Sequence, residues 1–287
     1  MSLIRPSPSE ISSPETSVGD KGRPALFLHA TPVEANTKAD VLLTHGMGEY
    51  SEKYGHVGRF FSEHGYRLCS YDLRGHGRSP GKRGHIRAYV ELLDDMETAM
   101  HHHRRAGVPM FLYGHSFGAQ ITLNYLLQRH PPVAGAIIAS PLLKLGFRPS
   151  PVKVVMAKLL LKLWPSFTQS GPNDRTLLTR DLAFLDSLPS PELLHHKVSA
   201  RMYHEIIEGA RRAREGASRY DYPMLVIQGE QDTMISVAAT KDFFDALAVA
   251  DKTLRIHPGM KHETQKEIGR EMVLAEMVEW MDKRLPA

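Results

Sequence analysis

The chain has a single cysteine, Cys69, which excludes an intramolecular disulfide and a cysteine-based metal site. It also lacks any apolar run of the ~18 residues that a membrane-spanning helix requires, and it has no apolar signal core near its start. We therefore expect a protein of a reducing compartment, located in the cytoplasm.

The sequence also lacks a large excess of charge of either sign. The 36 Lys and Arg residues are spread among 32 Asp and Glu residues, so the formal net charge is only +4 and no nucleic-acid partner is expected. Hydrophobic residues make up 42% of the 287 residues, which suffices for the core of one α/β domain with an insertion. Residues 1–20, rich in Ser, Pro and Glu, bury little apolar surface and predict a flexible tail.

Apolar, β-branched runs alternate with helical patterns along the rest of the chain. Several of these runs are apolar almost throughout, as in a parallel sheet that is covered on both faces. The predicted strands are Ala25–Ala30, Val41–Thr44, Tyr66–Tyr71, Met110–Tyr113, Ala134–Ala139, Met224–Gln228 and Thr253–Ile256. The predicted helices are Val57–His64, Tyr89–Arg105, Ala119–His130, Ala238–Ala248 and Glu267–Lys283. The alternation predicts the α/β class, with a mostly parallel central sheet and helices on both faces.

The alternation breaks between about Leu142 and Arg214, where helix-like segments follow one another without a convincing strand. We interpret residues 142–214 as a helical cap. The cap is inserted into a core that we expect to comprise residues 21–141 and 215–287.

A G-x-S-x-G motif, Gly114-His115-Ser116-Phe117-Gly118, stands between an apolar predicted strand and a predicted helix. This is the context of a nucleophile elbow, in which a tight turn exposes the serine. The flanking glycines carry no Cβ that would collide with neighbouring chain, and the helix N-terminus favours negative charge on the reacting oxygen. A chance glycine–serine turn is the alternative, but the flanking elements favour Ser116 as a nucleophile.

A serine hydroxyl needs a histidine to take its proton, and a carboxylate to hold that histidine in the right tautomer. Asp232 follows the predicted strand Met224–Gln228 at the sheet edge where α/β proteins build their sites. Glu230, closer to the strand, is the alternative acid. We favour Asp232.

Two histidines follow the last predicted strand. His262 stands in a Pro-Gly turn that projects it over the same edge of the sheet, whereas His257 ends the strand just before a proline. We favour His262 as the base and assign His257 a structural role. The predicted triad therefore follows the chain order Ser116, Asp232, His262.

Acyl transfer also needs N–H donors aimed at the developing oxyanion, each contributing about 3 kcal/mol of transition-state stabilisation. Phe117, directly after the serine, supplies one candidate donor. Met47, in the turn His45-Gly46-Met47-Gly48, supplies the other, with a simple glycine turn as the alternative interpretation.

The consecutive histidines at 101–103 point ~100° apart on a helix, which is poor geometry for a metal site. We expect neither a metal nor another cofactor.

With these elements in order, the chain resembles the monoglyceride lipase and lysophospholipase branch of the α/β-hydrolases, which also includes serine aminopeptidases. The resemblance runs from about Leu26 to Leu285. It implies the α/β-hydrolase fold with a Ser, Asp and His triad and an acyl-enzyme mechanism. Phe117 replaces the Met that is usual in monoglyceride lipases, and Met47 replaces a smaller residue. The matching segments are His45–Glu49, Tyr71–Ser79, Gly114–Gly118, Gly229–Asp232 and Gly259–Glu263.

The loop from Arg74 to His85 holds four cationic side chains, Arg74, Arg78, Lys82 and Arg83. Taken alone, it suggests phosphate binding. The resemblance implies instead that the loop is a structural connection.

The segment Pro151 to Trp164 places apolar residues over about half of a helical circumference, with Lys158 and Lys162 opposite. This helix could pack on its own domain, line an acyl tunnel or lie on a membrane surface. An apolar cap favours a small acyl ester or lipid substrate, because burial yields ~0.8 kcal/mol per methylene. Monoacylglycerols, lysophospholipids and simpler esters all fit. The alternatives are a serine peptidase and a non-catalytic module that binds a hydrophobic ligand; the oligomeric state stays open.

Overall fold

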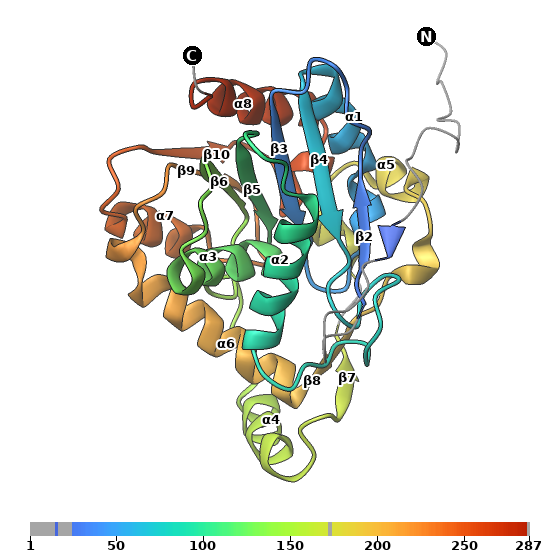
Figure 1. The fold of residues 1–287 in the computed structure, drawn as a ribbon. Coiled ribbons are helices and arrows are strands. Elements are labelled where there is room, and N and C mark those ends of the chain that lie inside the picture. Colours follow the sequence, from blue (N-terminus) through green and yellow to red (C-terminus); the bar gives the residue numbers. More distant parts are fainter. Residues whose placement is uncertain (1–14, 17–24, 172–173, 286–287) are drawn as a thin grey trace.

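The computed structural model describes residues 15–16, 25–171 and 174–285. Its centre is an eight-stranded sheet with the order β1-β2-β4-β3-β5-β6-β9-β10 (Figure 1). The strands are β1 Glu15–Thr16, β2 Phe27–Ala30, β3 Ala39–Thr44, β4 Tyr66–Tyr71, β5 Met110–His115, β6 Gly135–Ala139, β9 Met224–Gly229 and β10 Lys252–His257.

The strands from β4 to β10 in this order are parallel to one another, whereas β2 pairs antiparallel with β4. The predicted mostly parallel sheet is therefore confirmed, and each predicted strand is present. Because the six parallel strands end at one edge of the sheet, the loops that follow them gather there. Most of the predicted tail lies outside the described residues; Glu15–Thr16 pair with β2.

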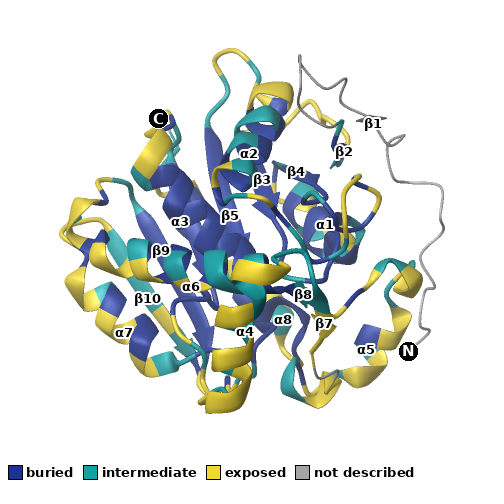
Figure 2. Ribbon diagram, turned by 90° about the horizontal axis from the view of Figure 1, so that it is seen from below, coloured by how far each residue is buried: buried dark blue, intermediate teal, exposed yellow. Residues whose placement is uncertain are grey.

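Helices cover both faces of the sheet. They are α1 Gly55–Glu63, α2 Val90–His103, α3 Phe117–Arg129, α7 Val237–Ala246 and α8 Arg270–Asp282. Side chains alternate along each strand, so Leu112 of β5 packs in the cluster with α2 and α3, while Phe111 and Tyr113 pack in the cluster with α1 and α8. Figure 2 shows the central strands, in dark blue, between the two helical layers.

Most of the described residues in the segment 142–214, called the cap segment below, lie on the side toward which β4 points in Figure 1. The segment contains α4 Pro151–Leu163, β7 Thr168–Ser170, α5 Leu182–Ser187, β8 Lys197–Ser199 and α6 Ala200–Glu215. The expectation that this segment holds no strand is wrong, since β7 and β8 pair antiparallel. These strands are three residues long and largely polar, so they leave no apolar alternation in the sequence.

The cap segment is anchored through α6, which packs against α3, and α4 packs in turn against α6. None of the helices built from the described residues combines the length and apolar character that a membrane span demands.

Candidate active site

Ser116 occupies the sharp turn between β5 and α3. Its backbone has φ 54° and ψ −113°, a region that residues with a side chain rarely adopt. Added Cβ atoms would lie 2.5 Å from Ala119 Cα at Gly114 and 2.0 Å from Thr44 O at Gly118, so only glycine fits at either position. The chain therefore turns as the G-x-S-x-G motif predicts, and it presents the Ser116 side chain at the carboxyl edge of the sheet.

The structure brings the three predicted triad residues together. The Nε2 atom of His262 lies 3.0 Å from Ser116 Oγ, and its Nδ1 atom lies 2.8 Å from Asp232 Oδ2. The other Asp232 oxygen accepts hydrogen bonds from the N–H groups of Met234 and Ile235, at 2.9 and 3.0 Å. The loops after β5, β9 and β10 supply one member each.

The surroundings of the pair fix its charge. Burial opposes ionisation of Asp232, but the facing His262 and the hydrogen bonds that the carboxylate accepts hold its pKa below the ordinary value. Burial likewise opposes protonation of His262, yet Asp232 raises the His262 pKa above the ordinary 6.5. The carboxylate thus favours the histidine cation that a proton transfer from Ser116 would create.

The two alternative residues lie elsewhere. Glu230 is exposed, and its carboxylate accepts a hydrogen bond from the N–H of Gly259 at 3.3 Å. His257 ends β10, and its Nε2 lies 3.5 Å from a carboxylate oxygen of Glu276 on α8. In this structure neither faces Ser116, so the geometry favours Asp232 and His262.

The turn after β3 lies directly against the elbow. A Cβ added to Gly46 would stand 3.4 Å from Ser116 Cβ. Within the described part of the chain, the N–H groups of Met47 and Phe117 form no hydrogen bond. These two predicted oxyanion donors lie on the segments that meet here, Met47 in the turn after β3 and Phe117 at the start of α3.

A buried group of four charges behind the triad was missed by the sequence analysis. It consists of Glu49, Lys53, Glu263 and Lys266, each at most 6% exposed. The only signal in the sequence was that Glu49 and Glu263 end the His45–Glu49 and Gly259–Glu263 segments, since charged side chains ordinarily predict a solvated surface.

The cap segment touches the same turn. The His195 N–H donates to Gly48 O at 3.1 Å, and the His195 ring lies 4.5 Å from the ring of His76.

Among the described residues, no group of three His, Cys, Asp or Glu side chains is arranged to hold a metal.

The basic loop is engaged in the fold. Arg74 forms ion pairs with Asp95 at 2.6 Å and Glu91 at 2.9 Å, and Lys82 Nζ donates to Ser166 O of the cap segment at 2.6 Å. These contacts favour the structural interpretation of the loop over phosphate binding.

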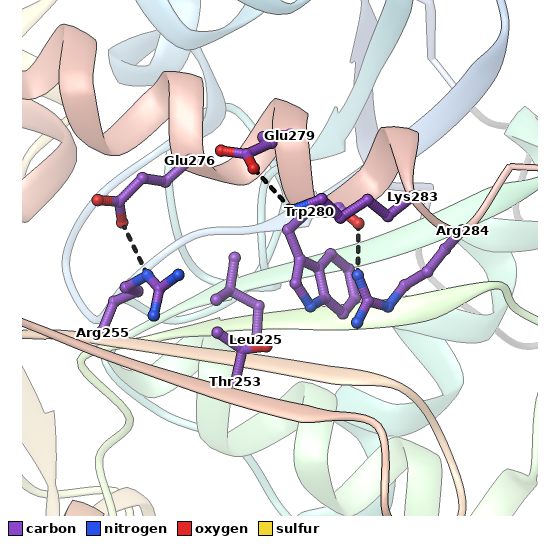
Figure 3. Close-up of a pocket in the computed structure, with 8 residues that line it drawn as sticks. All are labelled: Leu225, Thr253, Arg255, Glu276, Glu279, Trp280, Lys283 and Arg284. Carbon is purple, nitrogen blue, oxygen red and sulfur yellow. Dashed lines mark hydrogen bonds and ion pairs between the residues drawn. The ribbon is translucent and has the colours of Figure 1, made fainter.

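A small cavity of about 90 Å³ opens at the other end of β9 and β10, beneath α8 (Figure 3). Four of its five charged side chains pair with one another, Arg255 with Glu276 at 3.6 Å and Lys283 with Glu279 at 2.6 Å. The cavity is lined from the amino ends of strands whose carboxyl ends lead to the triad, so it is separate from the candidate site.

Residues 35–269 match the family described as serine aminopeptidase, S33. The chain belongs to this family. It is 35% identical over 250 residues to an abhydrolase domain-containing protein of Dictyostelium discoideum, covering 86% of this chain but only 26% of that much longer protein. It is 29% identical to a monoacylglycerol lipase of Mycolicibacterium smegmatis, over 88% of this chain and 91% of the relative.

The fold of this S33 family member also matches solved structures. A soluble variant of the monoglyceride lipase of Saccharomyces cerevisiae, in complex with a substrate analogue, superposes with a TM-score of 0.84 at 25% identity, covering 98% of this chain and all of the other. The predicted α/β-hydrolase fold and the resemblance to the monoglyceride lipase branch are thereby confirmed. These similarities identify the chain as a serine ester hydrolase.

Proposed function

We propose that the chain hydrolyses carboxylic esters of hydrophobic acyl chains, such as monoacylglycerols and lysophospholipids, through Ser116, Asp232 and His262. The observation that carries the proposal is the 3.0 Å contact between His262 Nε2 and Ser116 Oγ, with Asp232 on the other ring nitrogen. Similarity to monoacylglycerol lipases over most of both chains supports this substrate class.

In the first half of the reaction, Ser116 Oγ attacks the ester carbonyl while His262 takes its proton. Asp232 holds the imidazole with Nε2 facing Ser116 and stabilises the cation that forms. The N–H groups of Met47 and Phe117 donate to the oxyanion. His262 then protonates the departing alcohol, which leaves the acyl group on Ser116.

In the second half, His262 removes a proton from water, which attacks the acyl-enzyme. The tetrahedral intermediate uses the same two N–H donors. His262 returns the proton to Ser116 as the fatty acid leaves. Each proton passes through one imidazole, so the cycle requires no cofactor.

The cap segment, residues 142–214, is proposed to form the insertion that receives the acyl chain and contacts the lipid phase. Helix α4 has no buried residue. Only its Val154, Ala157, Leu160 and Leu161 side is partly covered, while most of the apolar arc noted in the sequence is exposed, up to 70% at Val152 and 74% at Leu163. Packing against its own domain therefore does not account for the exposed apolar side chains of this helix.

The composition of α4 favours contact with a membrane surface. Its exposed lysines are Lys153, Lys158 and Lys162, and residues 151–164 include no acidic side chain. Each lysine near anionic headgroups contributes about 1 kcal/mol, and the adjacent apolar side chains enter the acyl boundary. The view in Figure 2 shows α4 largely exposed at the surface.

The deciding experiment is a hydrolysis series on monoacylglycerols, lysophospholipids and p-nitrophenyl esters of increasing acyl length, with wild type and Ser116→Ala. Wild type should release fatty acid and show a specificity constant that rises with chain length, because each buried methylene contributes ~0.8 kcal/mol. Ser116→Ala should be inactive toward every ester. Equal, negligible turnover by both proteins would instead favour a non-catalytic binding module.

The family description favours one second candidate, a peptidase that removes N-terminal residues. The same triad can cleave amides, and the products tell the two apart. Aminoacyl p-nitroanilides and short peptides in the same series should yield no amine at a rate comparable with ester cleavage. Faster cleavage of the peptides would assign the chain to the peptidase function.

A further inference from the structure

Glu49 connects the turn after β3 to the elements around it. Its Oε2 atom accepts hydrogen bonds from the Gly46 N–H at 3.2 Å and the Tyr54 hydroxyl at 2.8 Å. Residue Glu49 is 6% exposed, so its carboxylate is satisfied mainly by protein groups rather than by water. One side chain therefore fixes the start of the peptide pair Gly46–Met47, which carries a proposed oxyanion donor.

Lys266 links this carboxylate to the loop that carries His262. It lies in the 3-10 helix η5 Thr264–Lys266, four residues beyond His262, and is fully buried. Its Nζ atom lies 2.6 Å from Glu49 Oε1 and 3.2 Å from Glu263 Oε2. The bridge joins segments 217 residues apart in the chain.

The nucleophile elbow meets the same carboxylate. The Nδ1 atom of His115, which precedes Ser116, lies 2.9 Å from the Tyr54 hydroxyl and 3.4 Å from Glu49 Oε2. Its Nε2 atom lies 3.5 Å from the backbone oxygen of His262. The oxyanion turn, the elbow and the histidine loop therefore converge on Glu49.

The buried charges balance and hold one another. Lys53 Nζ lies 2.8 Å from Glu49, so two carboxylates face two ammonium groups. Burial opposes ionisation of Glu49, but Lys266 and Lys53 hold its pKa well below the ordinary value. A buried charge without its partner is strongly destabilising, so this arrangement resists small displacements.

We propose that Glu49, held by Lys266, is a positioning residue that sets the orientation of the Gly46–Met47 segment toward the oxyanion. It acts through the backbone and touches no reacting atom. This inference rests on the proposed esterase function, since the oxyanion forms only when the carbonyl of an acyl substrate is attacked.

The test compares a p-nitrophenyl ester with its thiono analogue, in which sulfur replaces the carbonyl oxygen. Well-placed N–H donors stabilise an oxyanion more strongly than a thiolate-like sulfur, so the ratio of the two rates reports on their placement. In Lys266→Met and Glu49→Gln, we expect kcat for the oxoester to fall on the order of 10²-fold with KM nearly unchanged. The thionoester rate should fall far less.

Arg105→Met is the matched control. It breaks the 2.8 Å bridge to Asp40, a fully buried carboxylate at the opposite end of β3. This variant should lose stability without changing the rate ratio. Parallel losses on both esters in Lys266→Met, or an equal change of ratio in Arg105→Met, would show a merely structural role and overturn the proposal.

Two additions keep the test decisive. If Lys266→Met fails to fold, the double variant Glu49→Gln/Lys266→Met removes both charges together and is assayed in the same way. If wild type cleaves neither ester, the esterase function fails, and amide hydrogen exchange over residues 44–50 then decides. Faster exchange in Lys266→Met than in Arg105→Met supports positioning by Glu49, and equal exchange contradicts it.

Discussion

His262 Nε2 lies within hydrogen-bond distance of Ser116 Oγ, although 146 residues separate the two in the chain. The contact exists because β5 and β10 run parallel and release their loops at the same edge of the sheet. The sheet therefore holds the proposed base against the proposed nucleophile before any substrate binds.

The choice between two acidic residues is directly testable. Asp232→Asn should lower kcat by about 10⁴-fold, since an amide favours the wrong histidine tautomer and cannot stabilise its cation. Glu230→Gln is the control, because that carboxylate is exposed and contacts Gly259 instead. Steady-state kinetics of both variants decide; a comparable loss in Glu230→Gln would reverse the assignment.

The pH dependence follows from the raised pKa of His262. Only the neutral imidazole can take the proton of Ser116, so activity falls as the pH drops through that pKa. The acid limb of kcat/KM should therefore have its midpoint above 6.5. Asp232→Asn should move the midpoint lower, while His257→Gln should leave it in place. A midpoint that follows His257 instead would contradict the assignment of the base.

Glycine at the elbow is predicted to be indispensable. Gly118→Ala places a Cβ 2.0 Å from Thr44 O, so the free energy of unfolding should fall by about 3 kcal/mol and turnover should be lost. Gly55→Ala is the control, because an added Cβ there meets nothing within 4 Å. It should stabilise α1 by up to about 1 kcal/mol. Denaturant unfolding measures both, and equal effects would show that the close approach is unimportant.

Membrane contact through α4 predicts a separation of binding from chemistry. Val155→Glu/Leu159→Glu should weaken binding to anionic vesicles by at least about 10-fold in a sedimentation assay, because both side chains are exposed and apolar. Turnover of a short soluble ester should not change. Val33→Glu/Val90→Glu adds the same charge at exposed apolar positions elsewhere, and it should leave vesicle binding intact. Unaltered binding by the α4 variant would exclude this surface.

The sequence predicted the sheet well because its central strands β3, β5, β6 and β9 are buried throughout. Their apolar runs are therefore continuous, and every predicted strand is found within two residues of its observed bounds. The elbow could be predicted equally well. Positions that approach other backbone closely, such as Gly118, require glycine, and they therefore stand at a fixed spacing from Ser116 in the sequence.

The contacts between residues far apart in the chain could not be predicted from the sequence. Lys266 reads as a solvated lysine, and only the fold brings Glu49 and Glu263 to it. The paired strands β7 and β8 were not predicted, because hydrogen bonds between short segments that are distant in the chain leave no periodic pattern in the local sequence. The exposed side of α4 was also hard to predict, because apolar side chains lie on both its packed side and its free side.

Covalent labelling tests the proposed chemistry most directly. A fluorophosphonate should phosphonylate Ser116 with loss of fluoride, and intact-mass and peptide mass spectrometry should find one adduct on that residue. Labelling should disappear in Ser116→Ala and slow by at least about 10³-fold in His262→Ala, since the hydroxyl then loses its base. An adduct on another residue, or labelling of the His262→Ala protein at the wild-type rate, would contradict the Ser116–His262 mechanism.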